Sequence, residues 1–209
     1  EQNQVNAINY FDYDDTIIKP NIMIEMGEEA AGVDDVKRYK IPDQLNKQDY
    51  LNLCDSLNEK QHAYLMHLIN CFKQKDIPIH HYISGSAGVG KSRLIEAINQ
   101  SIIRLYRTEA GSVENFEVLL VAFTGNAAHN IKGMTAHSAF HLSTTEGTTR
   151  FKNLSDDLRN TLSCRFRNLK LLVIDEISML SSDHFMEIDG RLRETLDPNK
   201  PFGGVSVIT

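Results

Sequence analysis

Apolar residues recur along the chain at two spacings, and each spacing predicts one kind of element. Intervals of three and four residues place apolar side chains on one helical face in four segments, which are residues 58–72, 91–106, 156–169 and 185–196. Short unbroken apolar runs, typical of strands buried on both faces, cover residues 78–83, 116–123, 169–174 and 204–209. Helices and strands therefore alternate through most of the chain.

This alternation predicts an α/β fold in which helices cover both faces of a mainly parallel sheet, giving three layers. We assign residues 51–209 to this domain. Residues 1–50 lack a sustained period, contain Pro20 and Pro42, and carry 11 acidic against 5 basic residues. We expect these residues to form an acidic, poorly ordered lead-in.

The charge balance limits how the domain can meet nucleic acid. The net charge of −6 comes from the first 50 residues, because residues 51–209 hold 17 acidic and 17 basic residues. The domain therefore lacks the basic surface of a strong, non-specific DNA binder. Any nucleic-acid contact is expected to be local, or to use neutral donors.

Cysteines and apolar runs indicate an intracellular protein. Three cysteines without a CxxC pair, Cys54, Cys71 and Cys164, favour reduced thiols over a zinc site or a disulfide framework. The apolar runs are too short to cross a membrane, and the N-terminus shows no signal sequence. Because the chain starts with Glu1, we expect it to be a fragment.

The strongest chemical motif is a glycine-rich loop between a predicted strand and a predicted helix, Gly85-Ser86-Ala87-Gly88-Val89-Gly90-Lys91-Ser92. It matches GxxxxGK[ST], in which glycines let backbone N–H groups surround phosphates at a helix N-terminus. Lys91 would contact the β- and γ-phosphates, and Ser92 would offer its hydroxyl to Mg²⁺. The alternative is a glycine-rich turn that matches by chance, which the flanking strand and helix disfavour. We predict that the loop binds a nucleoside triphosphate with magnesium.

Two carboxylates follow a buried strand, at the end where ligands bind in open α/β sheets. Residues 171–174 are apolar, and Asp175 and Glu176 come directly after them. Asp175 would hold Mg²⁺, and Glu176 would orient or deprotonate the attacking water. Taken alone, the pair fits two solvated acids equally well, but the glycine loop favours catalysis. An acid in the position of Glu176 indicates an ATPase that activates water, since a phosphotransfer kinase needs no base there.

Three further stretches narrow the class, and they are Val121-Ala122-Phe123-Thr124-Gly125-Asn126-Ala127-Ala128, Gly133-Met134-Thr135-Ala136-His137-Ser138-Ala139-Phe140 and Pro201-Phe202-Gly203-Gly204-Val205-Ser206-Val207-Ile208. With Asp175-Glu176-Ile177-Ser178-Met179 they resemble the superfamily 1B DNA helicases. The likeness is strongest to the petite-integration-frequency (PIF) helicases, including copies carried by Helitron transposons. It runs from about residue 57 to residue 209.

The resemblance implies a P-loop, RecA-like domain that binds ATP and Mg²⁺ against a second RecA-like domain. It also implies movement 5′ to 3′ on single-stranded DNA and unwinding of duplex and folded DNA. Leu57-Asn58-Glu59-Lys60-Gln61 resembles the family's adenine-recognition motif, which implies that the Gln61 amide reads the adenine edge. Asn58 and Gln61 also have the spacing of a capping box at a helix start, and the two roles can coexist.

The resemblance further implies two DNA-contacting segments, which are Thr124-Gly125-Asn126 and the trio Thr135, His137 and Ser138. Hydroxyls, an amide and backbone N–H groups can hold phosphates without net charge, as suits a neutral domain. The family usually has lysine where this chain has Asn126, so one cation is missing from the expected DNA path.

His137 is open to several interpretations. It would stack on a base, bond a phosphate, or bond internally at a helix start. His137 and His141 have the spacing of a metal-binding pair, but the sequence offers no third ligand nearby, so metal binding is disfavoured.

These features predict the N-terminal motor domain of an ATP-dependent DNA helicase that acts in DNA repair, recombination or telomere maintenance. We expect a nuclear protein, with the mitochondrion as a second location. The chain stops at Thr209, where the family continues into a Gly-Asp, a γ-phosphate-sensing Gln and the second domain with its arginines. For these 209 residues alone we expect weak nucleotide binding and negligible unwinding. Two alternatives remain, a P-loop ATPase switch or clamp and a non-catalytic relic of a mobile element.

Overall fold

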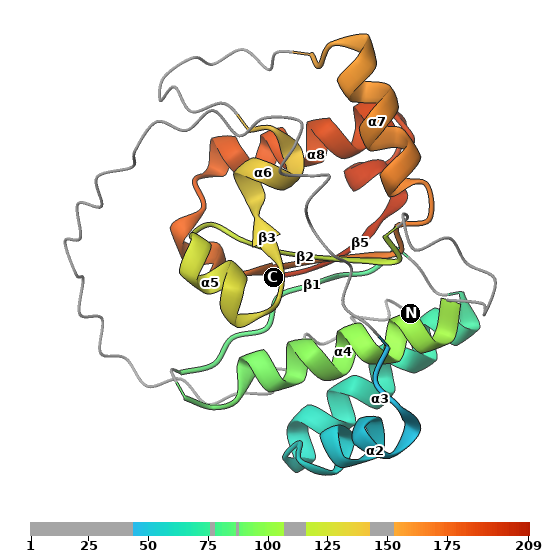
Figure 1. The fold of residues 1–209 in the computed structure, drawn as a ribbon, viewed down its shortest axis with the longest axis vertical. Helices are drawn as coiled ribbons and strands as arrows, with labels where there is room; N and C mark the ends of the chain where they lie inside the picture. Colours follow the sequence, from blue (N-terminus) through green and yellow to red (C-terminus); the bar gives the residue numbers. More distant parts are fainter. Residues whose placement is uncertain (1–43, 76–77, 87, 107–115, 143–152) are drawn as a thin grey trace, which may run out of the picture.

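The computed structural model describes residues 44–75, 78–86, 88–106, 116–142 and 153–209 (Figure 1). Five parallel strands form one sheet, and they are β1 (His80–His81), β2 (Val118–Ala122), β3 (Met134–Thr135), β4 (Leu171–Asp175) and β5 (Ser206–Ile208). Their order is β1-β5-β4-β2-β3, so the last strand lies between the strand before the glycine loop and the strand that ends in Asp175. The predicted α/β fold with a parallel sheet is confirmed.

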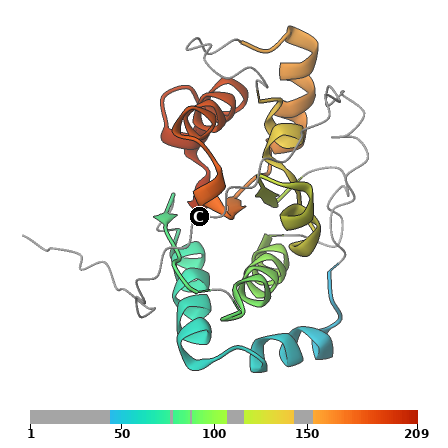
Figure 2. The same ribbon diagram turned by 90° about the vertical axis from the view of Figure 1, so that its left-hand side faces the viewer.

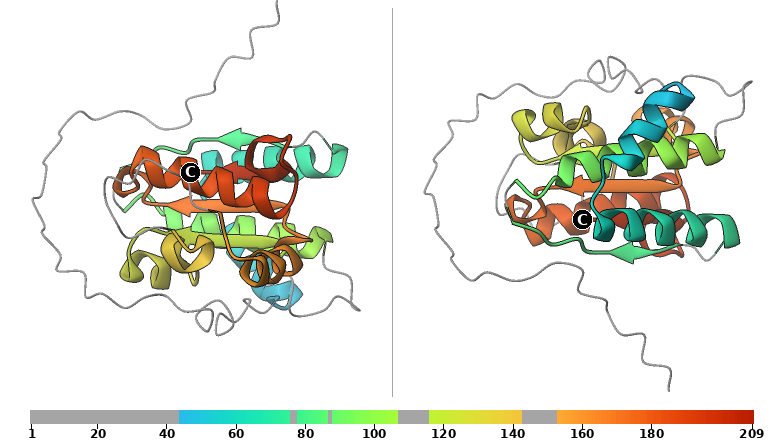
Figure 3. Two further views of the ribbon diagram at one scale, coloured as in Figure 1. Left: turned by 90° about the horizontal axis from the view of Figure 1, so that it is seen from above. Right: turned by 90° about the horizontal axis from the view of Figure 1, so that it is seen from below.

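Helices cover both faces of this sheet, as the views from the side and from above and below show (Figures 2 and 3). One face carries α3 (Glu59–Gln74) and α4 (Lys91–Tyr106), with α2 (Lys47–Asp55) packed on α4. The other face carries α6 (Ala136–Phe140), α7 (Asp156–Phe166) and α8 (Ser182–Thr195). The remaining elements are α5 (Gly125–Asn130) and two 3₁₀ turns, η1 (Ile177–Met179) and η2 (Pro201–Gly204).

The central strands are buried on both sides because alternate residues belong to two different cores. Val118, Leu120 and Ala122 of β2 pack against the α3 and α4 layer. Leu119 and Val121 pack against α6, α7 and α8. Burial of each valine or leucine side chain contributes about 1.5–3 kcal/mol to stability, so an unbroken apolar run is what this position in the sheet requires.

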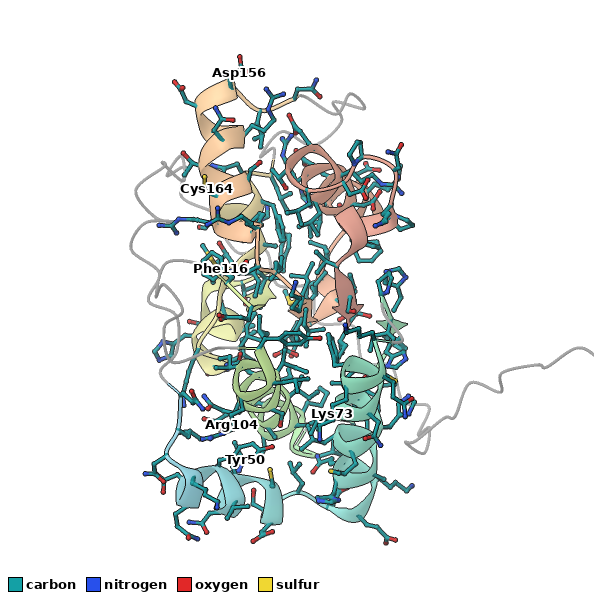
Figure 4. All side chains as sticks on the ribbon, turned by 90° about the vertical axis from the view of Figure 1, so that its right-hand side faces the viewer. Tyr50, Lys73, Arg104, Phe116, Asp156 and Cys164 are labelled. Carbon is teal, nitrogen blue, oxygen red and sulfur yellow. The ribbon has the colours of Figure 1, made fainter. Side chains whose placement is uncertain are left out.

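The chain is ordered earlier than we expected. Residues 44–50, which we assigned to the poorly ordered lead-in, include the start of α2, so that assignment is wrong for them. Asn46 caps α2 by accepting a hydrogen bond from Asp49 N, and Tyr50 shares a 2.9 Å hydrogen bond with Ser101. Arg104 of α4 lies 4.4 Å from the Tyr50 ring centroid, and Figure 4 labels both side chains. The predicted disorder of residues 1–43 lies outside the described residues.

Two short helices follow β2 and β3, and the sequence pattern did not predict them. Thr124 caps α5 by accepting a hydrogen bond from Ala127 N, and Thr135 caps α6 by accepting one from Ser138 N. Gly133 lets the turn between them pass close to β2, because a Cβ at this position would lie 2.4 Å from Leu120 O. The segments after β2 and β3 are therefore built by helix caps and one close approach, rather than by long periodic elements.

Candidate functional site

The glycine-rich loop connects β1 to α4 at the carboxyl edge of the sheet (Figure 1). Gly88 and Gly90 have φ angles of 80° and 89°, a conformation that residues with a Cβ rarely adopt. α4 begins at Lys91, directly after this turn, so its first backbone N–H groups face the loop. Ala87 lies outside the described residues. The loop thus has the glycine-dependent backbone that the motif predicts.

The Lys91 side chain folds back over the loop. Its Nζ donates a 2.8 Å hydrogen bond to Gly85 O and a longer one, 3.4 Å, to Ser86 O. The ammonium group is half-buried and is held by carbonyl dipoles of the loop itself. A polyphosphate at the loop would offer this cation charged oxygens, which are stronger acceptors than carbonyls.

Gln61 is buried between the start of α3 and the glycine loop, with 4% of its surface exposed. Its Oε1 accepts a hydrogen bond from Asn58 N, and Asn58 Oδ1 accepts one from Gln61 N, which confirms the capping box. Its Nε2 donates to Val89 O at 3.0 Å and to Gly90 O at 3.3 Å. The amide therefore braces the loop, and the reading of adenine by Gln61 stays a prediction.

We expect Gln61→Glu to weaken nucleotide binding by about tenfold and to lower stability by about 1–3 kcal/mol, because a carboxylate oxygen would face the Val89 and Gly90 carbonyls. The α3 cap survives, since glutamate is equally suited to the third helical position. Thermal unfolding and calorimetric titration with Mg²⁺ and ATP measure both effects. Asn58→Asp is the matched control, since it makes the same amide-to-acid change in the same cap at an exposed position. Equal effects of the two variants would contradict the bracing role.

The two predicted acids stand at the end of β4 and differ in environment. Asp175 is half-buried and accepts a 3.1 Å hydrogen bond from Glu176 N. Glu176 is exposed and has φ 56° and ψ 44°, the left-handed conformation. This conformation costs a residue with a Cβ about 1–2 kcal/mol. Strain of this kind in a non-glycine residue is typical of functional positions, so the backbone supports the predicted role of Glu176.

Lys91, Asp175 and Glu176 line one cavity of about 170 Å³. The sequence analysis missed four polar residues that also line it, which are Tyr82, Ser84, Ser178 and Thr209. Three of these four follow β1 or β5 at the same sheet edge, and strand ends are the signal that could have identified them. Ser92 does not line this cavity. It is exposed on the first turn of α4 and borders a separate hollow toward Asn130.

The two predicted DNA-contacting segments lie side by side. Parallel pairing of Ala122 with Thr135 brings the segments after β2 and β3 to the same edge of the sheet. Thr124 Oγ1 accepts from Ala127 N at 3.3 Å, and Thr135 Oγ1 bonds both Ser138 N and Ser138 Oγ. Both threonines are therefore helix caps. Gly125 and Asn126, the first two residues of α5, are exposed.

His137 packs in a ring cluster with Phe123 and His184. Its ring centroid lies 5.2 Å from that of Phe123 and 5.0 Å from that of His184. Burial lowers the pKa of His137 below its usual range, and His184 lowers it further, while Glu187 acts in the opposite direction. Among the described residues, no three His, Cys, Asp or Glu side chains are grouped as metal ligands would be. His137 lies in the first turn of α6 and its ring packs against these two rings, and its contact with a base or a phosphate stays a prediction.

None of the helices in the described ranges is both long and apolar enough to cross a membrane.

Residues 56–209 match the family model for the PIF1-like helicase. The chain belongs to the PIF1-like helicase family. It is 33% identical over 129 residues to the ATP-dependent DNA helicase PIF1 of Emericella nidulans, a match that covers 61% of this chain and 16% of that protein. It is 28% identical over 195 residues to human PIF1, covering 93% of this chain and 27% of the human protein. The chain thus spans a small part of the PIF1-like helicases it matches.

Solved Pif1 structures have a similar fold. The crystal structure of Pif1 helicase from Candida albicans superposes with a TM-score of 0.55 at 30% identity, covering 73% of this chain and 31% of that one. Pif1 from Bacteroides in complex with ADP-AlF3 and single-stranded DNA gives a TM-score of 0.51 at 28% identity, with 73% and 31% covered. These matches confirm the predicted family and the RecA-like fold of this PIF1-like chain.

Proposed function

We propose that the chain is the ATP-binding motor domain of an ATP-dependent DNA helicase that moves 5′ to 3′ on single-stranded DNA. The observation that carries this proposal is the cavity in which Lys91 from the loop meets Asp175 and Glu176 from β4. A cation beside the phosphate-binding loop and an acid at the end of a neighbouring strand are two of the parts that ATP hydrolysis requires. The relatives of this chain are named ATP-dependent DNA helicases, which supports the same activity here.

Each residue of the site has a task in this proposal. Backbone N–H groups of the loop and of the α4 N-terminus bind the phosphates. Lys91 exchanges the carbonyls of Gly85 and Ser86 for phosphate oxygens. Asp175 and the Ser92 hydroxyl would hold Mg²⁺, which supplies positive charge against the phosphates. Ser92 is not among the residues that line the cavity, so this pairing requires the loop to adjust.

Glu176 and Gln61 have the two remaining roles in the proposed ATP site. Glu176 accepts a proton from the attacking water, and its exposed position at the cavity leaves its carboxylate accessible. Gln61 holds the carbonyls of Val89 and Gly90 and so keeps the loop in place while phosphates enter. Its predicted contact with adenine requires one of these hydrogen bonds to be exchanged.

We further propose that single-stranded DNA contacts the segments after β2 and β3. Gly125 supports this, because a Cβ there would meet no atom of the described residues within 4 Å, so their packing does not require glycine. A glycine at an exposed helix start leaves room for the backbone of another molecule to approach closely. Asn126 follows Gly125 in the segment after β2, and His137 lies in the segment after β3, which parallel pairing brings to the same edge of the sheet.

We expect Gly125→Val to weaken binding to single-stranded DNA about tenfold and to leave stability within about 1 kcal/mol, because a Cβ at this position meets no atom of the described residues within 4 Å. Gly133→Ala is the matched comparison. Its Cβ would lie 2.4 Å from Leu120 O, so it is expected to cost about 1–3 kcal/mol of stability. Fluorescence anisotropy with an oligonucleotide and denaturant unfolding separate the two effects. Unchanged DNA affinity in Gly125→Val would remove this segment from the DNA path.

A motor and a switch differ in how DNA affects hydrolysis. In the motor, ATP binds between this domain and a second RecA-like domain, and the enzyme unwinds duplex or folded DNA. We propose the nucleus as its location, with the mitochondrion as a second one, and DNA repair, recombination or telomere maintenance as its task. The test measures ATP hydrolysis by the protein that carries this chain, with and without single-stranded DNA. Stimulation supports the motor, whereas DNA-independent hydrolysis supports a switch or clamp.

A further inference from the structure

Three rings from three separate elements meet beside the predicted DNA-contacting segments. Phe123 follows β2, His137 lies in the first turn of α6, and His184 lies in the first turn of α8. The centroids of Phe123 and His184 are 6.0 Å apart, so each ring of this cluster lies within contact distance of the other two. The sequence resemblance singled out His137 and gave no role to Phe123 or His184.

The cluster is partly open to solvent and is held in place. All three side chains are half-buried, so the ring edges that do not face one another are accessible. Ser181 caps α8 by accepting a hydrogen bond from His184 N, and its hydroxyl also shares a 3.1 Å hydrogen bond with His184 Nδ1. The His184 ring is therefore oriented by the helix start. Ordered rings of this kind form a stacking surface at low cost in side-chain entropy.

The chemistry of the cluster suits a nucleobase better than a phosphate. Burial and the neighbouring His184 both lower the pKa of His137, which disfavours the charged form of this ring. A His137 ring that resists protonation is a poor partner for a phosphate, whereas every base has an aromatic face that stacks on rings.

The position of the cluster fits a strand that is held by its phosphates next to it. Phe123 directly precedes Thr124, and His137 lies between Thr135 and Ser138, so both rings adjoin the groups proposed to contact phosphates. We propose that His184, together with Phe123 and His137, stacks against a base of single-stranded DNA. This inference rests on the proposed DNA-binding function and adds α8 to the DNA-contacting surface.

The test compares an oligothymidylate with an abasic oligonucleotide of the same length, by fluorescence anisotropy at low salt. We expect wild-type chain to bind the abasic strand about tenfold more weakly, because stacking on one base contributes about this factor. We expect His184→Ala to bind the ordinary strand about tenfold more weakly than wild type, and to lose no more than about twofold on removal of the bases. His184→Phe keeps a ring and is expected to restore most of the dependence on bases.

Two controls show whether a loss is specific. Thermal unfolding shows whether His184→Ala is folded, and His184→Phe tests the same position with a ring retained. His62→Ala removes an exposed histidine from α3, on the opposite face of the sheet, and is expected to bind both strands like wild type.

The outcomes distinguish this inference from the proposed function. If wild type binds the ordinary and the abasic strands equally well, DNA binding stands and base stacking is wrong. If His184→Ala weakens both strands by the same factor, or neither, His184 does not stack on a base. If wild type binds neither strand, the proposed DNA-binding function fails, and this inference fails with it.

Discussion

Lys91→Ala is expected to lower the affinity of the chain for ATP with Mg²⁺ by about 100-fold. The Lys91 ammonium is the one side-chain cation that lines the cavity with Asp175 and Glu176 in the described part of the chain. Hydrogen bonds from a charged donor to a charged acceptor contribute about 1.5–3 kcal/mol, and the upper value applies to phosphates at a helix N-terminus. Isothermal titration calorimetry with ATP and Mg²⁺ measures the change.

The folded state is expected to change little in this variant. Among the described residues, Lys91 donates to two loop carbonyls, Gly85 O and Ser86 O, of a half-buried and an exposed residue. Lys73→Ala is the matched control, because Lys73, labelled in Figure 4, is an exposed lysine near the end of α3 that does not line the cavity. ATP affinity that survives Lys91→Ala unchanged would show that the loop does not bind phosphates through this residue.

Glu176→Gln is expected to reduce ATP hydrolysis by about 10²–10⁴-fold while leaving ATP affinity within about twofold. The glutamine amide keeps the size of the side chain and cannot accept the proton of the attacking water, which is the contribution of a general base. The measurement is the steady-state hydrolysis rate of the protein that carries this chain, beside an ATP titration of the same variant. Hydrolysis at the wild-type rate would assign Glu176 to the solvated acids that the sequence alone also allowed.

Glu176→Gly separates the chemical role from the backbone. Glycine adopts the left-handed conformation of residue 176 without the penalty of a Cβ, so this variant is expected to gain about 0.5–1 kcal/mol in the free energy of unfolding. Hydrolysis is expected to be lost as in Glu176→Gln. A chain that is more stable without its acid would show that the strained conformation is kept for function. Denaturant unfolding measures the gain, and a clear loss of stability would contradict it.

Long periodic elements could be predicted from the sequence because their burial follows directly from their pattern. α4 has the bounds that the apolar spacing indicates, and β4 ends at Asp175 within one residue of the expected place. The glycine loop and the acid pair were identified for the same reason. Each depends on adjacent residues and on the strand beside it, so local sequence contains the information.

Short elements depend on contacts that the sequence does not show. α5 and α6 are 6 and 5 residues long, too short for an apolar period, and threonine caps start them. α2 has little apolar character, and its position comes from Tyr50 and Arg104, which meet only in the folded chain. The sequence does not indicate Thr209 or His184 for the same reason. Parallel pairing brings Thr209 to the cavity, and helix packing brings His184 to the rings of Phe123 and His137.

ATP and single-stranded DNA are expected to occupy two separate places on the carboxyl edge of this sheet. Amide chemical shifts in ¹⁵N-labelled chain test it most directly, with Mg²⁺ and ATP titrated first and an oligothymidylate in a parallel sample. ATP is predicted to shift the amides of Gly88, Gly90 and Lys91, and DNA those of Gly125 and Asn126. ATP that leaves the three loop amides unchanged would contradict the account.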